Sequence, residues 1–321
     1  MDKWLAPEFR NLLANNKFSD CRIIVDNKSF ECHKIILASA SEFFERWFLK
    51  ETESKDFPLE EVELEIFEKF LEYIYTYDAK KLRTYSLSTL KKLLEYADRF
   101  LVASITNECL SLFQEKVSSM LIGDLVSLFD LGQKLSKDRL IQIVINAIEE
   151  NAQRFRLTAN CYEVLELTVN AFEEYNKIVT NILPESERFK MIETYLFFHG
   201  VLDETPNGKE EHKNNANDVK SEDKHLQKLQ VSEIVDSLRE KEKETNYSSN
   251  EMDNENIRQL IQRLLATIDF SKMNVDDFYN IVGASGLLSY QQKFQYLYLT
   301  TSNGIAKCQC HTLKKFGFGS G

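Results

Sequence analysis

Glycine and proline are scarce in this chain of 321 residues, which contains only 10 and 4 of them. Both residues interrupt helices, and tight turns between short strands depend on them. Their scarcity therefore excludes an all-β sandwich rich in tight turns and favours long helices. Apolar residues make up 43% of the chain, and its length is sufficient for two domains, since one hydrophobic core usually serves about 100–200 residues.

Positive charge is also in short supply. The formal net charge is −11 and the isoelectric point is near 5.2. Proteins that bind nucleic acids normally carry a basic stripe that neutralises phosphates. The lysine pairs Lys80–Lys81 and Lys91–Lys92 are instead surrounded by acidic residues. We therefore expect no direct binding of DNA or RNA.

Long apolar runs and closed sets of metal ligands are missing. No stretch approaches the roughly 18 consecutive apolar residues of a membrane span, and residues 1–16 lack the apolar run of a signal peptide. Cys308-x-Cys310-His311 offers three zinc ligands, whereas a closed structural site needs a fourth. We expect no membrane partner, no metal and free thiols in a reducing compartment, cytoplasmic and/or nuclear.

Catalytic signatures are lacking as well. No G-x-G-x-x-G or P-loop motif occurs. His33 and His199 stand in apolar helical contexts, and the other histidines lie in segments that we predict to be flexible. The many carboxylates are interpreted as solvated helix faces. We expect neither an enzyme nor a bound cofactor.

What the sequence does contain is a short β-hairpin followed by helices. Residues 21–25 and 29–32 are predicted strands around the turn at 26–28, and 57–59 is a predicted edge strand, where proline is tolerated. Apolar residues at helical spacing predict an amphipathic helix over 4–14. The same spacing predicts helices over 33–49, 64–76, 86–102, 104–117, 121–135, 137–151, 171–183 and 186–199.

The character of the sequence changes at Asp203. From there to Asn256 the chain is dominated by Glu, Lys, Asn, Asp and Ser. Such a stretch buries too little apolar surface to offset its ordering entropy, so we predict disorder. An apolar patch at 226–238 is either a fraying helix within this stretch or a docking segment. Order is predicted to return over 257–300, and 301–321 is a predicted flexible tail.

Two stretches resemble the BTB/POZ signature. FSDCRIIV, from Phe18, and FECHKIILASASEFF, from Phe30, resemble the family pattern F-x-D, a hairpin and F-x-x-H-(K/R)-x-x-L-(A/S)-x-x-S-x-x-F. FEKFLEYIYT, from Phe67, resembles the family helix F-x-x-(L/F)-L-x-(Y/F)-I-Y-T, although Tyr77 replaces the usual following glycine. The resemblance implies a BTB/POZ domain over 18–115, in which His33 is a hydrogen-bonded structural residue.

The helical remainder looks like a BACK domain, the region that follows BTB in many ubiquitin-ligase adaptors. Residues 116–202 and 257–300 carry this looser resemblance, which implies that 203–256 is an insertion inside the domain. No kelch repeat, zinc finger or MATH module is found in the sequence. The expected fold is an α+β BTB/POZ domain followed by an all-α BACK-type domain, mostly helical overall.

The resemblance also implies a dimer. The helix within residues 1–17 would pack against its two-fold mate, because an isologous interface needs a self-complementary apolar face; the alternative is that it folds back onto its own domain. Asp20 and Lys34 resemble paired charges at the base of the dimer groove, the alternative being two separately solvated charges. The apolar residues of the helix face are Leu5, Phe9, Leu12 and Leu13.

A cullin partner is implied at a second surface. Leu49-Lys50-Glu51 has the hydrophobic-x-Glu pattern that inserts into cullin helices in this family, although Leu49 could equally end a core helix while Glu51 is solvated. Tyr77 lies near that surface in the family. Met120 stands where BACK-containing adaptors add contacts, and is otherwise a core residue.

Two functions are consistent with these features. The first is a dimeric adaptor that recruits a protein substrate to a cullin-3 RING ubiquitin ligase. The second is a BTB scaffold or transcription-associated protein that binds a co-regulator peptide without a ligase. The pairing of the chain with itself or with a different BTB protein stays open.

Overall fold

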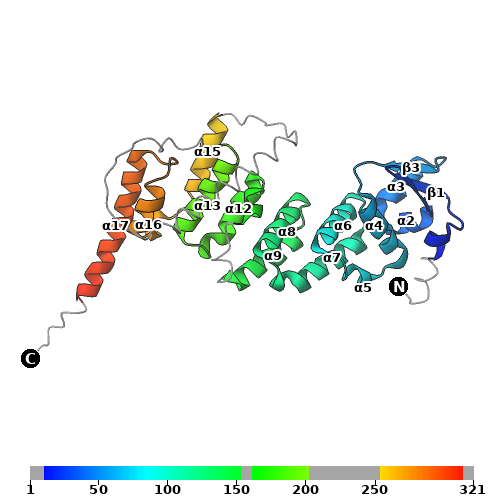
Figure 1. Ribbon diagram of the computed structural model, residues 1–321, viewed down its shortest axis with the longest axis horizontal. Helices are drawn as coiled ribbons and strands as arrows, with labels where there is room; N and C mark the ends of the chain where they lie inside the picture. Colours follow the sequence, from blue (N-terminus) through cyan, green and yellow to red (C-terminus); the bar gives the residue numbers. More distant parts are fainter. Residues whose placement is uncertain (1–10, 153–160, 202–253, 314–321) are drawn as a thin grey trace, which may run out of the picture. The chain divides into compact units, whose positions relative to one another are not determined.

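The computed structural model describes residues 11–152, 161–201 and 254–313, with side chains up to Thr301. The chain forms two compact units, Met1–Leu157 and Thr158–Gly321, whose elements are labelled in Figure 1. The predicted helix over 4–14 is seen only in part, because residues 11–15 are helical and 1–10 lie outside the described residues. Most of the predicted insertion, 202–253, also lies outside them.

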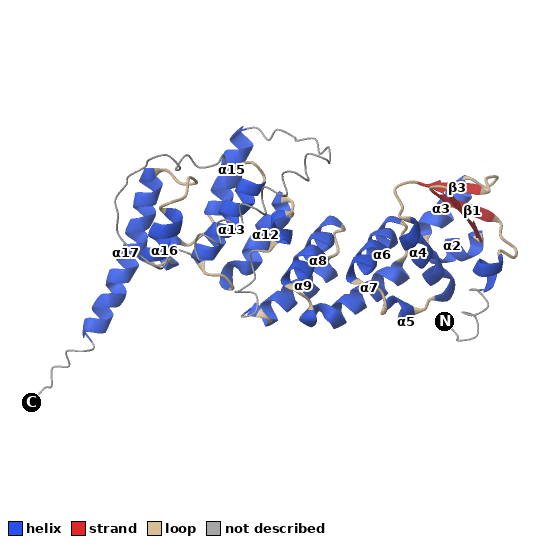
Figure 2. Ribbon diagram, viewed as in Figure 1, coloured by secondary structure: helices blue, strands red, loops and turns tan. Residues whose placement is uncertain are grey.

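A three-stranded sheet opens the first unit (Figure 2). Its strands are β1 (Cys21–Val25), β2 (Lys28–Cys32) and β3 (Asp56–Leu59), in the order β2-β1-β3. β1 runs antiparallel to β2 and parallel to β3. Every second side chain of β1 is buried, as expected of a strand with one face on a core. All three predicted strands are confirmed.

Helices make up the rest of the first unit. The predicted helix over 33–49 is in fact two helices, because the extended backbone of Ser41 ends the first and its hydroxyl accepts a hydrogen bond from Phe44 N (3.1 Å), capping the second. The helices are α2 (Lys34–Ala40), α3 (Glu42–Lys50), α4 (Leu64–Thr76), α5 (Ala79–Leu82), α6 (Leu87–Arg99), α7 (Ala103–Lys116), the 3-10 turn η1 (Val117–Ser119), α8 (Ile122–Lys134) and α9 (Asp138–Glu150).

The core of this unit is centred on the buried ring of Phe100. Its ring centroid lies 5.6 Å from that of Phe44 on α3, 5.4 Å from Phe70 on α4 and 5.9 Å from Tyr96 on α6. Aromatic pairs at such separations add to the burial of apolar surface. The Ser41 hydroxyl also donates to the Phe100 carbonyl (2.5 Å). One residue at the end of α6 therefore holds three helices together.

Two further helices belong to the same unit. α8 and α9 pack against each other, and α9 packs against α7. The first compact unit consequently reaches Leu157, and the boundary of the BTB/POZ domain at 115 stays a prediction. The predicted fold class, an α+β domain followed by helices, is confirmed.

The second unit is helical throughout its described residues. α17 continues to Leu313, whereas a flexible tail was predicted from 301. The elements are α11 (Tyr162–Leu165), α12 (Val169–Ile178), η2 (Val179–Asn181), α13 (Glu185–Phe198), α15 (Asn254–Leu265), η3 (Phe270–Lys272), α16 (Val275–Asp277), η4 (Phe278–Val282) and α17 (Tyr290–Leu313).

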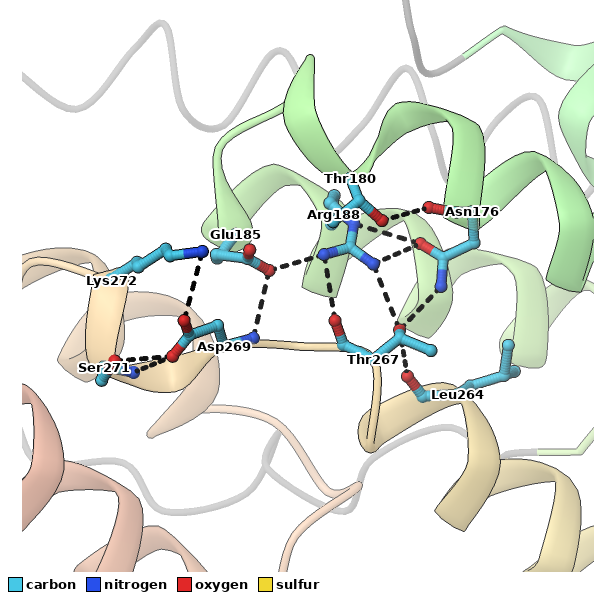
Figure 3. Close-up of polar contacts among 9 residues, drawn as sticks. All are labelled: Asn176, Thr180, Glu185, Arg188, Leu264, Thr267, Asp269, Ser271 and Lys272. Atoms are coloured by element: carbon cyan, nitrogen blue, oxygen red, sulfur yellow. Dashed lines mark hydrogen bonds and ion pairs between the residues drawn. The ribbon is translucent and has the colours of Figure 1, made fainter.

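A buried guanidinium joins the two sequence segments of this unit (Figure 3). The Arg188 side chain on α13 is fully buried and donates to Glu185 Oε2 (2.8 Å) and to the Thr267 carbonyl (3.1 Å). It also donates to Asn176 Oδ1 on α12 (3.2 Å), and Asn176 in turn donates to Thr267 Oγ1 (2.8 Å). Glu185 accepts a further hydrogen bond from Asp269 N (3.3 Å).

These hydrogen bonds link the part of the chain that precedes residues 202–253 to the part that follows them. Thr267 and Asp269 follow that segment in sequence, whereas Asn176, Glu185 and Arg188 precede it. α13 also packs against α15 and η4. The two pieces of chain therefore share one core, and a charge pair is buried within it because hydrogen bonds satisfy both partners.

We expect Arg188→Met to destabilise the second unit by about 3–5 kcal/mol, because Glu185 would remain as a buried charge without its partner. Urea unfolding followed by circular dichroism measures this loss. Lys177→Met is the matched control, since it removes the exposed pair with Glu174 on α12 and should leave the midpoint nearly unchanged. Equal effects of the two substitutions would contradict the role of the buried pair.

Candidate interaction surfaces

His33 anchors the segment that leads into the hairpin. Its Nε2 donates to the Lys17 carbonyl (2.7 Å), because a carbonyl oxygen can only accept. The Tyr75 hydroxyl on α4 accepts from His33 N (3.0 Å) and donates to His33 Nδ1 (2.9 Å). Both ring nitrogens thus have partners within the core. The predicted structural role of His33 is confirmed.

Asp20 and Lys34 meet through the backbone. The Asp20 carboxylate accepts from Lys34 N (2.7 Å), which places a negative charge at the first turn of α2, where the helix dipole favours it. The Lys34 ammonium points elsewhere, donating to the Ser54 carbonyl (3.0 Å) and lying 5.2 Å from the centre of the Phe57 ring. The two side chains therefore link the start of α2 to the residue before β1 and to the loop before β3. They do not form a direct ion pair with each other.

Two large apolar side chains close to these residues in sequence are exposed. Phe18 is 86% exposed and Ile35 is 78% exposed. Phe18 has a left-handed backbone (φ 64°), which bulky residues adopt rarely and mostly where function requires it. Leu12 and Leu13 on the neighbouring helical turn are half-buried. We call Leu12, Leu13, Phe18 and Ile35 the N-terminal patch.

The sequence predicted only part of this patch. Leu5 and Phe9 lie outside the described residues. Phe18 and Ile35 fall within the recognised signature, but neither was assigned to a surface. Ile35 sits among apolar neighbours in a helix, so its spacing alone gave no sign that it faces outward.

A second surface is formed by α3 and the turn after α6. A groove of about 300 Å³ is lined by Phe43, Arg46, Trp47, Lys50 and Leu101. Leu101 adopts a left-handed backbone (φ 53°), directly after the buried Phe100. Because Phe100 fills the core, Leu101 is directed outward and closes one side of the groove.

Leu49 and Glu51 stand at the end of α3, next to the groove. Leu49 is 70% exposed, so the interpretation of it as a core residue is wrong. Glu51 caps the helix and its carboxylate accepts from Trp47 Nε1 (3.2 Å). The hydrophobic-x-Glu sequence is therefore presented on the surface, with Glu51 held by a groove residue.

Tyr77 and Met120 are placed differently. Tyr77 ends α4 with a left-handed backbone (φ 49°), a conformation that usually needs glycine, and its half-buried ring lies 5.6 Å from that of Tyr73. Met120 is buried, as in the alternative that makes it a core residue, and the cullin contact at this position stays a prediction. The adjacent Leu121 is exposed.

The family follows from comparison with known proteins. A family model described as BTB/POZ domain matches residues 9–117. This chain contains a BTB/POZ domain. The match covers the sheet, α2 to α7, the N-terminal patch and the groove. The helices beyond Val117 lie outside it.

Similar proteins extend the likeness past the BTB domain. "Kelch-like protein 40" from Xenopus laevis is 30% identical over 167 residues, covering 51% of this chain and 26% of that protein. "Kelch-like protein 41b" from Danio rerio is 28% identical over 168 residues, with 51% and 26% covered. The chain thus spans about a quarter of the length of these relatives.

Solved structures were matched as well. The BTB domain of human Gigaxonin is 20% identical with a TM-score of 0.30, covering 35% of this chain and 92% of that one. The BTB domain of zebrafish PATZ1 is 25% identical with a TM-score of 0.31, covering 36% and 95%.

In the ranges that the structure describes, no group of three or more His, Cys, Asp or Glu side chains is arranged to hold a metal ion. None of the described helices combines the length and apolar character needed to cross a membrane.

The thiols of the BTB sheet are buried. Cys21 and Cys32 face each other across β1 and β2, and both are free. Burial raises the pKa of Cys21 and raises that of Cys32 to about 12. Since the thiolate is the reactive form, both side chains are interpreted as small core residues.

We expect Cys21 and Cys32 to resist N-ethylmaleimide in the folded chain near neutral pH, because burial both shields the thiols and suppresses the thiolate. Peptide mass spectrometry after brief labelling reports each site. The same chain unfolded in urea is the control, since an exposed thiol has a pKa of about 8.5 and reacts readily. Fast labelling of Cys32 in the folded chain would show that the sheet opens.

Proposed function

We propose that this chain is a non-enzymatic, dimeric adaptor that recruits protein substrates to a cullin-3 RING ubiquitin ligase. The observation that carries the proposal is the exposed Leu49 beside the α3 groove, followed by the fixed Glu51. The BTB domain and the Kelch-like relatives support an interaction adaptor in general. The specific partners below are inferred from the surfaces.

The N-terminal patch is our proposed dimer interface. Its two most exposed members, Phe18 and Ile35, are large apolar side chains that a monomer would leave in water. A two-fold axis through such a patch would bury each residue against its own copy or a close neighbour. Leu5 and Phe9 would extend the contact, and Asp20 and Lys34 would fix its base by holding the hairpin against α2.

We expect Ile35→Asp to raise the dissociation constant of the dimer by about 100-fold or more, because the symmetric interface would bury two carboxylates without partners. Sedimentation equilibrium of the full chain measures it. Leu121→Asp places the same charge on another exposed aliphatic residue of the first unit and should leave the dimer intact. A dimer unaffected by Ile35→Asp would place the interface elsewhere.

The α3 groove is our proposed cullin site. Leu49 offers an apolar side chain to a cullin helix, and the groove behind it has apolar walls from Phe43, Trp47 and Leu101. Arg46 and Lys50 line the groove as well, and Arg46 is paired with Glu42 (3.1 Å). Leu121 would contribute a further contact, and Tyr77 remains a proposed one at the end of α4.

We expect Leu49→Glu to weaken binding to the N-terminal domain of cullin-3 by about 100-fold or more, because a carboxylate would replace the central apolar contact. Calorimetry with the full chain measures the affinity. Val275→Glu is the matched control, an exposed apolar residue of the second unit. Unchanged affinity of the Leu49 variant would remove the α3 groove from the proposal.

The remaining helices are proposed to form the BACK-like stalk. Residues 116–202 and 257–300 would constitute it, with 203–256 inserted, and the contacts of Arg188 with Thr267 support one domain on both sides of the insertion. We propose that the stalk also presents the target. We place the protein in the cytoplasm and/or nucleus, where cullin ligases act.

A scaffold that binds a co-regulator peptide is the second candidate. A groove of about 340 Å³ beside the N-terminal patch favours it, lined by residues of the helical turn, β2 and α4, with Leu13, Phe30 and Leu71 as its apolar members. A folded dimer that does not bind cullin-3 would select this function. No metal or cofactor has a part in either proposal.

A further inference from the structure

Strand β2 forms one edge of the three-stranded sheet. In the order β2-β1-β3, only one side of β2 is paired, with β1. The Arg22 N–H donates to the Lys55 carbonyl (2.6 Å), just before β3, so the backbone of Arg22 faces β3. Backbone groups of successive residues in a strand point in opposite directions. The backbone groups of Cys21, Ile23 and Val25 therefore face β2.

The register decides which backbone groups of β2 point away from β1. Ile23 lies opposite Phe30, so the backbone of Phe30 bonds to β1. Ser29 and Glu31 alternate with Phe30, and their N–H and C=O groups point outward from the edge. Among the described residues, none forms a hydrogen bond with these outward groups. A row of such groups is a template for another strand.

A groove accompanies this edge on the inner side of the sheet. It has a volume of about 340 Å³ and is lined by residues 28–31 of β2 together with Leu13 and Leu71. Phe30 pairs with the buried Ile23, and its ring lies 5.5 Å from that of Phe67 on α4, so its side chain belongs to the inner face. A strand added to β2 would direct every second side chain to this groove.

Opposite charges alternate across the outer face of the sheet. The register places Asp56 beside Arg22 and Arg22 beside Glu31, with one residue on each strand. Arg22 donates two hydrogen bonds to Asp56 (2.6 and 2.9 Å), so its guanidinium is directed to β3. Glu31 accepts from Ser19 Oγ (3.3 Å), and no lysine or arginine of the described residues forms an ion pair with it. The row ends in a carboxylate at the open edge, where a cation on a further strand would continue the alternation.

We propose that the open edge of β2 accepts an extended, basic segment of a partner protein as a fourth strand. The segment would carry lysine or arginine opposite Glu31 and apolar side chains at the neighbouring positions, which face the inner side. Its backbone would pair with Ser29 and Glu31, so that main-chain hydrogen bonds supply affinity and alternate side chains supply specificity. This inference rests on the second candidate function, the peptide-binding scaffold, and adds how the peptide is held and which charge it carries.

The outward N–H of Ser29 distinguishes strand addition from binding by side chains alone. Ser29→Pro removes it, and proline is tolerated on an edge strand where the N–H has no partner in the sheet. Ser29→Thr is the matched control, because it keeps the N–H and suits a strand. The probes are displayed random peptides of roughly eight residues, the length of a strand, selected on the full chain. We expect the selected peptides to bind Ser29→Thr normally and Ser29→Pro about 30-fold or more weakly.

The charge of Glu31 provides a second test. The selected peptides should alternate apolar residues with lysine or arginine, and Glu31→Lys should lower their affinity about 10-fold or more by placing like charges opposite each other. Selection on Glu31→Lys should instead yield Asp or Glu at that position. Glu149→Lys makes the same change of net charge on the exposed surface of α9 and should leave the affinity unchanged.

The same hydrogen bonds are testable from the peptide side in the unmodified chain. N-methylation at successive peptide positions should weaken binding with a period of two residues, because every second N–H faces β2. Circular dichroism of each variant should match that of the unmodified chain. A uniform effect of N-methylation along the peptide would contradict strand addition even if a variant of Ser29 failed to fold.

Three further results would overturn the proposal. The first is that peptides depend on Glu31 but bind Ser29→Pro and Ser29→Thr equally, which would keep the groove as a peptide site without strand addition. The second is that selected peptides depending on Ser29 carry no excess of lysine or arginine. The third is self-association of the full chain that disappears in Ser29→Pro, which would make β2 of a second copy the fourth strand.

Failure of this inference is distinguishable from failure of the proposed functions. If no selected peptide depends on Ser29 or on Glu31, the second candidate function fails together with the inference. The affinity for cullin-3 should be unchanged in Ser29→Pro and in Glu31→Lys. Peptide binding that persists in Leu49→Glu, with cullin binding lost, would separate the β2 edge from the α3 groove.

Discussion

The packing of α3, α4 and α6 around Phe100 is the contact on which the BTB domain depends. The ring is fully buried among aromatic side chains from all three helices, and the Ser41 hydroxyl binds its carbonyl. This arrangement also positions the proposed cullin surface. Because Phe100 is held inside, the left-handed Leu101 that follows it is directed outward, opposite Phe43 and Trp47 of α3. Two consecutive residues thus contribute to the core and to the surface, Phe100 to the first and Leu101 to the second.

A different principle organises the second unit. Its two sequence segments are joined by a buried charge and not by rings alone. The Arg188 guanidinium finds partners on α12, on α13 and on the chain after 253, so its burial is tolerated only when both segments are present. The buried guanidinium therefore favours the packing in which the chain after residue 253 returns to α12 and α13.

The exposed apolar groups are concentrated in places that suit interaction. Phe18 and Ile35 lie beside the hairpin, and Leu49 and Leu101 lie beside α3. Tyr290, Phe294 and Tyr298 lie on α17. Single hydrophobic residues on a protein surface are normal. Contiguous apolar patches often mark interaction sites, because exposing a large apolar area to water is unfavourable. In the proposed adaptor, the N-terminal patch and the α3 groove would serve different partners.

The sequence by itself determined the elements and the family. Strands and helices have fixed side-chain periods, so local patterns in the sequence indicate them. Such patterns are the alternation in Cys21–Val25, the apolar spacing of α4 and α6, and the signature around His33. Only the tertiary structure decided which apolar residues are buried. Leu49 and Met120 are both large apolar residues, yet the first is exposed and the second buried. Three further features likewise depend on neighbours distant in sequence: the break at Ser41, the packing of α8 and α9 in the first unit, and the partners of Arg188. Local spacing does not specify such packing, because packing is a property of the assembled chain.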